Sequence, residues 1–208
     1  LEFLAAGFRE HGYDLKWLHR EICTSDTYQR SWEPNETNRL DERNFARAVP
    51  RRLPAEVAYD AIRVATAGAA EAAEICQVDT RRAIADPVVS RRGGSYALTV
   101  FGRSIRESNC DCDRSAEPSL LQTVFLQNDA EMLGMIDRKG GWLAEATAAA
   151  ADPEALVAEA YLRTLTRRPT AAELTRSLAH VRSADSLRDG MRDLLWALLN
   201  TKEFIVNH

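Results

Sequence analysis

The fold class is indicated most clearly by residues 152–173, which read DPEALVAEAYLRTLTRRPTAAE. Asp152 followed by Pro153 is the N-cap and first-position pair that commonly opens a helix. Thr170 and Glu173 then form the capping-box pattern at the start of a second helix. Apolar residues recur inside the first helix at Leu156, Ala160 and Leu165. We therefore predict a helical hairpin here.

A third helix is predicted after this hairpin. Ser186 or Asp189 can cap it, and its apolar residues are Leu194, Leu195, Leu198 and Leu199. Helices joined by links this short pack as neighbours. Residues 152–208 should therefore form a helical sub-lobe.

The N-terminus repeats this helical pattern. Leu1, Leu4 and Phe8 share one face, and Gly12 is suited to stop the helix. Asp14 can cap a second helix, which carries Leu15, Leu18 and Ile22. The two helices should form a hairpin with residues at its seam or rim, namely Trp17, His19 and Arg20.

The middle of the chain is less regular. Prolines and asparagines interrupt residues 31–50, which predicts loops with short turns. Pro54 opens an alanine-rich helical stretch over residues 55–73, and an exposed connection is expected over residues 76–94. Residues 96–101, YALTVF, are the best strand candidate. A helix should begin at residues 118–119 and end near residues 140–141. The residues expected to face inward in the alanine-rich stretch are Val57, Ala61, Val64 and Ala65.

The predicted fold is therefore all-α: mainly helical, with long irregular segments and at most one short β-hairpin. The 208 residues fit one domain, residues 1–208. The chain begins as if in the middle of a helix, so we interpret it as a fragment of a larger multidomain protein. No apolar run approaches the roughly 20 residues that span a bilayer.

The charge balance restricts the function classes. A net charge of −4 disfavours a nucleic-acid surface. Lysine occurs only at positions 16, 139 and 202, so nearly all of the 27 cations are arginine. Guanidinium groups pair bidentately with carboxylates. We expect mainly internal ion pairs, with binding of an anionic glycan as the alternative for three doublets: Arg51–Arg52, Arg81–Arg82 and Arg91–Arg92.

The segment between residues 95 and 119 holds the densest unusual chemistry of the chain, including a polar loop with Cys110 and Cys112. Two cysteines separated by one residue are closer than the usual pair of zinc ligands, so we expect no tightly bound metal. We favour a packed loop in which Arg114 or Arg106 pairs with a carboxylate. A disulfide to Cys23 or Cys76 remains open. With residues near the N-terminal hairpin, this loop gives the candidate functional cluster: His19, Arg20, Tyr28, Arg106, Cys110, Asp111, Cys112, Asp113 and Arg114. For His19, an interface role is favoured over acid–base catalysis.

Several separate phrases run in a fixed order along nearly the whole chain. They are GYDLKWLHR at 12–20, SDTYQRS at 25–31, RRLPAE at 51–56, FGR at 101–103, CDCDRS at 110–115, PSLLQ at 118–122, RRPTAAEL at 167–174 and LLNTKEF at 198–204. Together they resemble the C-terminal domain of unknown function, number fifteen fifty-three in that series, of large planctomycete proteins. Those proteins often carry cytochrome c-like domains upstream.

The resemblance implies an exported parent protein in the periplasm or at the cell surface. Haem would belong to its upstream domains, because no Cys-x-x-Cys-His pattern occurs in this chain. We expect no cofactor here, and a non-catalytic structural or protein-interaction module that contacts other domains of the parent or a protein partner. One alternative is a glycan-binding or hydrolytic domain that uses the Cys110–Arg114 loop with His19 and Arg20. A second alternative is a docking module for a cytochrome c-like domain.

Overall fold

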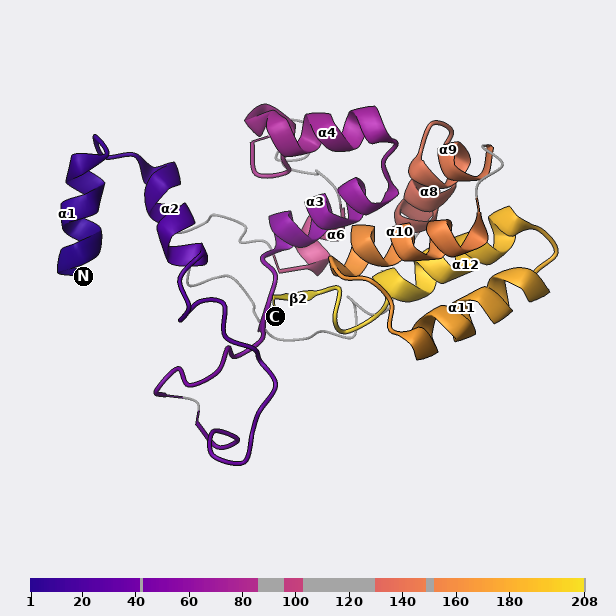
Figure 1. The fold of residues 1–208 in the computed structure, drawn as a ribbon. Helices are drawn as coiled ribbons and strands as arrows, with labels where there is room; N and C mark the ends of the chain where they lie inside the picture. The colour runs from indigo at the N-terminus through magenta and orange to yellow at the C-terminus, as the bar shows by residue number, and fades with distance from the viewer. Residues whose placement is uncertain (42, 86–95, 103–129, 149–151, 208) are drawn as a thin grey trace. The chain divides into compact units, whose positions relative to one another are not determined.

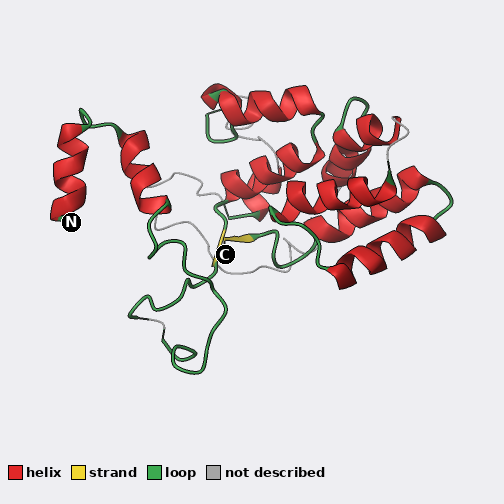
Figure 2. Cartoon of the chain, in the orientation of Figure 1, coloured by secondary structure: helices red, strands yellow, loops and turns green. Residues whose placement is uncertain are grey.

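The computed structural model describes residues 1–41, 43–85, 96–102, 130–148 and 152–207 (Figure 1). Contacts along the chain group it into two compact units. One, here called the N-terminal unit, comprises residues 1–51 with the last two residues, and the other, here called the bundle unit, comprises residues 52–206. Helices make up nearly all the regular structure (Figure 2), which confirms the predicted all-α class. The single domain over residues 1–208 stays a prediction.

The N-terminal unit begins with two short helices, α1 (Glu2–Glu10) and α2 (Leu15–Cys23). Gly12 has a φ of +64°, the left-handed conformation that glycine adopts without strain, and it turns the chain after α1. The Asp14 carboxylate accepts a hydrogen bond of 2.8 Å from the Lys16 amide and so caps α2. Both predicted helix boundaries are confirmed.

Trp17 forms the seam of this hairpin. A Cβ placed on Gly7 of α1 would lie 2.3 Å from the Trp17 ring, so only glycine lets the indole approach this closely. The His11 ring stacks on the same indole at 4.2 Å between centroids. One aromatic residue therefore holds the two helices together.

Residues 24–41 and 43–50 form turns rather than helices (Figure 2), which agrees with the loops predicted over residues 31–50. Side chains satisfy the backbone there: Asn35 accepts from the amides of Thr37 and Asn38, both at 3.0 Å. Asp41 accepts from the amide of Asn44 at 2.8 Å. Such local hydrogen bonds compete with helix formation and favour turns.

Three helices form the base of the bundle unit: α10 (Pro153–Leu165), α11 (Ala171–Ser183) and α12 (Leu187–Leu199) (Figure 1). Each packs against the other two. Their caps are the predicted ones, because the Asp152, Thr170 and Ser186 side chains all accept from backbone amides in the first turn. Thr170 and Glu173 complete the reciprocal capping box.

The remaining described elements of the bundle unit pack on this base or on one another. They are α3 (Ala55–Thr66), α4 (Ala69–Gln77), the short 3₁₀ helix η1 (Asp79–Arg81), α6 (Tyr96–Val100), α8 (Ala130–Asp137) and α9 (Trp142–Ala148). The apolar faces of α3, α6, α8 and α9 join those of α10, α11 and α12 in one core, whose fully enclosed side chains include Ile62, Leu98, Met132, Leu143, Leu195 and Leu199. Strands β1 (Arg51–Arg52) and β2 (Val206–Asn207) pair as a two-stranded sheet.

Two predictions about the middle segments were wrong. Residues 96–100 form a helix rather than a strand, because Leu98, which is 2% exposed, packs its turn against α3. Tertiary burial outweighs the β-propensity of so short a run. Val57 is 49% exposed instead of facing inward, whereas Ala65 is buried as predicted; the buried stripe of α3 is formed by Ala55, Ala58, Tyr59, Ile62 and Ala65.

The alanine-rich stretch is also divided, since α3 and α4 are separated at Ala67 and Gly68. The predicted helix from residues 118–119 lies largely outside the described residues, although α8 ends before Gly140 and Gly141 as expected. Among the described residues, no helix combines the length and the apolar character needed to cross a bilayer.

Candidate functional site

The predicted cluster is only partly visible. His19 and Arg20 lie on α2 with exposed side chains, and Tyr28 is 51% exposed in the turn that follows. The other members, Arg106 and residues 110–114, lie outside the described residues. The prediction that these residues form one site therefore stays a prediction.

The disulfide that the sequence left open can be checked at Cys23 and Cys76. Cys23 and Cys76 are both free and exposed, so neither forms the disulfide that the sequence left open. In the part of the chain that the structure describes, no group of three or more His, Cys, Asp or Glu side chains is placed to hold a metal ion.

Tyr28 belongs to a groove within the N-terminal unit, here called the arginine groove. Its volume is about 750 Å³. Three of its lining residues are arginines: Arg30, Arg47 and Arg51. The others are Ile22, Ser25, Thr27, Tyr28, Gln29, Phe45, Ala48 and Val49, so none of the described lining residues carries a carboxylate. A cavity that combines apolar walls with cations only is suited to an anionic, partly apolar ligand.

Polar contacts shape this groove from within. Arg30 Nη1 donates to the Phe45 carbonyl at 2.9 Å and joins two segments 15 residues apart. The Ser25 hydroxyl donates to the Ile22 carbonyl at 2.7 Å. The Gln29 side-chain amide donates to the Cys23 carbonyl at 2.6 Å. Several of the groove's polar side chains are thus already occupied by the fold.

Arg47 is less well satisfied. Its Nε is buried without a hydrogen-bond partner, and its Nη1 lies 3.5 Å from the Ala48 carbonyl, at the limit of a hydrogen bond. Among the described residues, no carboxylate lies within ion-pair distance of Arg30, Arg47 or Arg51. A cation in this state retains capacity for an external acceptor.

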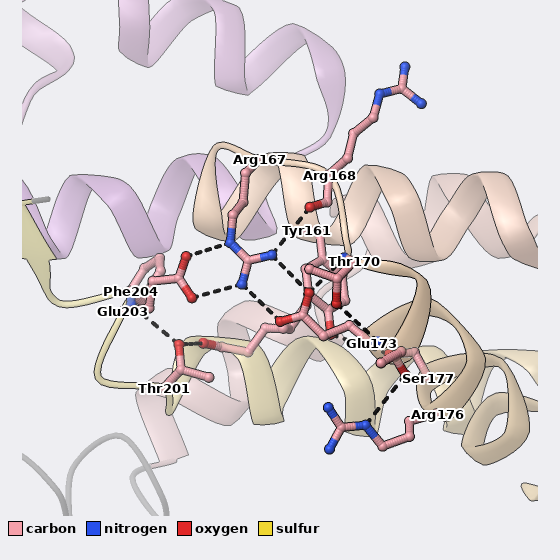
Figure 3. A network of polar contacts seen from close by, with 12 residues as sticks. Tyr161, Arg167, Arg168, Thr170, Glu173, Arg176, Ser177, Thr201, Glu203 and Phe204 are labelled. Atoms are coloured by element: carbon pink, nitrogen blue, oxygen red, sulfur yellow. Dashed lines mark hydrogen bonds and ion pairs between the residues drawn. The ribbon is translucent and has the colours of Figure 1, made fainter. Parts of the chain in front are cut away.

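The bundle unit uses arginine differently. Figure 3 shows Arg167 lying between two carboxylates, with Glu173 of α11 on one side and Glu203 of the C-terminal segment on the other. The Arg167 nitrogens approach Glu173 at 2.8 and 2.9 Å and Glu203 at 2.6 and 2.9 Å. The guanidinium therefore binds each acid with two hydrogen bonds, the geometry in which an arginine pair is strongest.

This network, here called the Arg167 clamp, perturbs its members. The hydrogen bonds from Arg167 lower the pKa of Glu173 to about 2, helped by the Thr170 amide. The hydrogen bonds to Glu173 and Glu203 raise the pKa of Arg167 further above its ordinary value. Arg167 and Glu173 are therefore both held charged. The groups of the clamp perturb one another through their mutual contacts. The clamp therefore joins the link between α10 and α11 to the C-terminal segment.

A second arginine joins other elements of the bundle unit. Arg163 of α10 donates to Glu159 at 2.8 Å and to the Ala67 carbonyl, at the end of α3, at 3.1 Å. Its guanidinium also lies 5.3 Å from the centre of the Trp142 ring of α9. Ion pairs at Arg63–Asp60, Arg138–Glu71 and Arg192–Asp137 continue this use of arginine.

Sequence reasoning missed Phe45, Arg30 and Arg47 as site residues. Arg30 stood within one of the recognised phrases, but no local signal links it to Phe45. The Arg167 clamp was also missed, although RRPTAAEL and LLNTKEF both belong to the phrases on which the resemblance rests. The common feature is a contact between segments that are distant in sequence.

Comparisons with known proteins agree with the resemblance. The family model described as PSD1, protein of unknown function (DUF1553), matches residues 1–181. No curated protein and no solved structure matches the chain. Because the match covers most of the chain, including the N-terminal hairpin, the residues of the arginine groove and the capping box, the chain belongs to the DUF1553 (PSD1) family of proteins of unknown function.

Proposed function

We propose that the chain is a non-catalytic protein-interaction module of a larger exported protein. The bundle unit is the scaffold, and the N-terminal unit is the part that recognises a partner. That partner is another domain of the same parent protein. Nothing in this assignment requires a cofactor within this chain.

One observation carries the proposal. None of the described side chains of residues 1–51 is buried, yet many are large and apolar. Exposed examples are Leu1, Phe3, Tyr13, Leu15, Ile22, Tyr28, Trp32, Leu40, Phe45 and Val49. Soluble proteins rarely expose so much apolar surface in one region unless it contacts a partner. The bundle unit, by contrast, has its own core and charge network, which are the features expected of a stable scaffold.

A cytochrome c-like domain of the parent is the more specific candidate partner. Such a partner requires an exposed apolar surface bordered by charge, and the N-terminal unit places Tyr28 and Phe45 beside Arg30. This observation favours a protein partner over the glycan alternative, in which hydroxyl groups would need many polar contacts.

Hydrogen–deuterium exchange can test the proposal with the full chain and the separately purified remainder of the parent protein. Binding should protect amides in residues 1–51 and leave those of α10–α12 unchanged. Leu15→Asp, at a site 60% exposed, should weaken binding. The matched control is Leu162→Asp on α10, at a site 43% exposed, which should leave binding unchanged. Protection confined to residues 153–199, or no binding, would refute the proposal.

A further inference from the structure

The arginine groove has a composition that selects its ligand. Its three arginines supply positive charge without a neutralising acid among the described lining residues. Its apolar walls include Ile22, Phe45 and Val49. A ligand that matches both features must present carboxylates next to apolar groups, because charge alone would leave those walls in contact with water.

The polar side chains of the groove disfavour a sugar. The Ser25 hydroxyl donates to the Ile22 carbonyl and accepts from the Tyr28 amide at 3.3 Å. The Gln29 amide is bonded to the Cys23 carbonyl. An oligosaccharide would bring hydroxyls that need partners, and an unsatisfied polar group in a groove weakens binding. A peptide needs fewer such partners, because its apolar side chains can cover the walls.

We infer that the arginine groove binds an extended acidic peptide in which Glu or Asp residues are interspersed with large apolar residues. This inference rests on the proposed function and names the segment type of the partner that the N-terminal unit recognises. Arg47 and Arg51 bind the peptide carboxylates, and Tyr28 and Phe45 pack on its apolar side chains. The Arg47 guanidinium has no carboxylate partner among the described residues, and a peptide carboxylate would supply one.

Arginine clusters are a recurrent device for recognising acidic motifs. The arginines of the groove differ from Arg167, whose donors are used by Glu173 and Glu203. The groove arginines and Arg167 carry the same charge, and they differ in how many hydrogen-bond donors remain available. Binding should weaken as salt is added, because the site is open to solvent.

Fluorescence anisotropy with the full chain tests the inference. The probe is a labelled peptide that alternates glutamate with leucine, and the matched peptide has glutamine in place of every glutamate. We expect the acidic peptide to bind at least roughly tenfold more tightly, since each charge-assisted hydrogen bond gives about that factor. Equal binding of the two peptides, or no binding of either, would overturn the inference.

Two variants locate the site. Arg47→Gln should weaken binding roughly tenfold, and Arg51→Gln, at an exposed position, serves if the first variant does not fold. Arg39→Gln removes the same charge from an exposed arginine of the same unit outside the groove and should leave the Kd unchanged. Equal losses in all three variants would indicate nonspecific charge attraction and contradict the assignment.

Competition separates a peptide ligand from a glycan. Unlabelled polygalacturonate should displace the acidic peptide less effectively than the unlabelled peptide itself, compared per carboxylate. More effective displacement would assign the groove to an acidic glycan instead. If the peptide does not bind while the remainder of the parent still protects residues 1–51, the inference fails and the proposed function stands.

Discussion

The two units of this chain make opposite use of the same residue types. In the bundle unit, leucines enter a common core and Arg167 binds two acids. In the N-terminal unit, Leu15 is 60% exposed and no described carboxylate pairs with Arg47. Apolar area and guanidinium donors thus stabilise the fold in one unit and remain available to a partner in the other. Composition alone does not separate these roles.

The largest expected effect contrasts a leucine from each unit. Leu195→Ala removes a side chain that is 0% exposed, so it should lower the free energy of unfolding by about 2–5 kcal/mol. Leu15→Ala should change it by less than about 0.5 kcal/mol, because the side chain is already in water. Urea unfolding followed by circular dichroism measures both. Similar losses in the two variants would show that the N-terminal unit has a core of its own.

The next effect concerns the Arg167 clamp. Arg167→Ala leaves Glu173 and Glu203 facing each other without a cation, and we expect a loss of about 2 kcal/mol at this partly exposed site. Arg168→Ala is the matched control, since its exposed side chain points away from the clamp (Figure 3). Thermal unfolding should separate the two variants. Equal melting temperatures for Arg167→Ala and Arg168→Ala would show that the clamp does not stabilise the bundle unit.

The clamp also predicts a pH dependence. The pKa of Glu173 is lowered from 4.5 to about 2 by hydrogen bonds from Arg167. A carboxyl group whose pKa is lower in the folded state contributes stability that is complete above its unfolded pKa and is lost as the pH falls. Stability should therefore decline between pH 4.5 and pH 2, by about 1–2 kcal/mol once solvent screening is allowed for.

Glu173→Gln provides the control for this dependence. It removes the titrating group, so the unfolding free energy of the variant should fall less steeply over the same pH range. Parallel pH profiles for the variant and the unaltered chain would mean that Glu173 is not the group responsible.

The smallest expected effect compares two helix caps. Thr170→Ala removes the acceptor of the Glu173 amide and should cost about 1 kcal/mol of global stability. Asp14→Ala removes the corresponding acceptor of the Lys16 amide in α2. Because the N-terminal unit has no buried side chain among its described residues, we expect this change to increase amide exchange in α2 with little change in the global unfolding midpoint.

Much of the fold could be predicted because helix ends are local. Asp14, Asp152, Thr170 and Ser186 act on amides within three residues, and Gly12 adopts the conformation that its missing Cβ permits. The loops predicted over residues 31–50 follow for the same reason. The strand proposed at residues 96–101 failed because a six-residue apolar run is compatible with either structure, and packing against α3 made it helical.

The candidate site was predicted less well. Tyr28 was named and lines the arginine groove, whereas Phe45 and Arg47 were not named. Their proximity to Tyr28 depends on how the turns of residues 24–50 fold back, including the bond from Arg30 to the Phe45 carbonyl. His19 and Arg20 are exposed on α2 and do not line the groove. Such non-local contacts leave no spacing pattern along the chain.

The amino-acid sequence alone therefore specified the capped boundaries of α2, α10, α11 and α12, the all-α class and the family, since each depends on short-range patterns or on ordered phrases. Tertiary packing selected which stripe of α3 is buried, and it joined Arg167 to Glu203 across 36 residues. It also left the apolar residues of the N-terminal unit uncovered. The physical reason is that burial and pairing depend on which distant segments pack against one another, and local propensity carries no information about that.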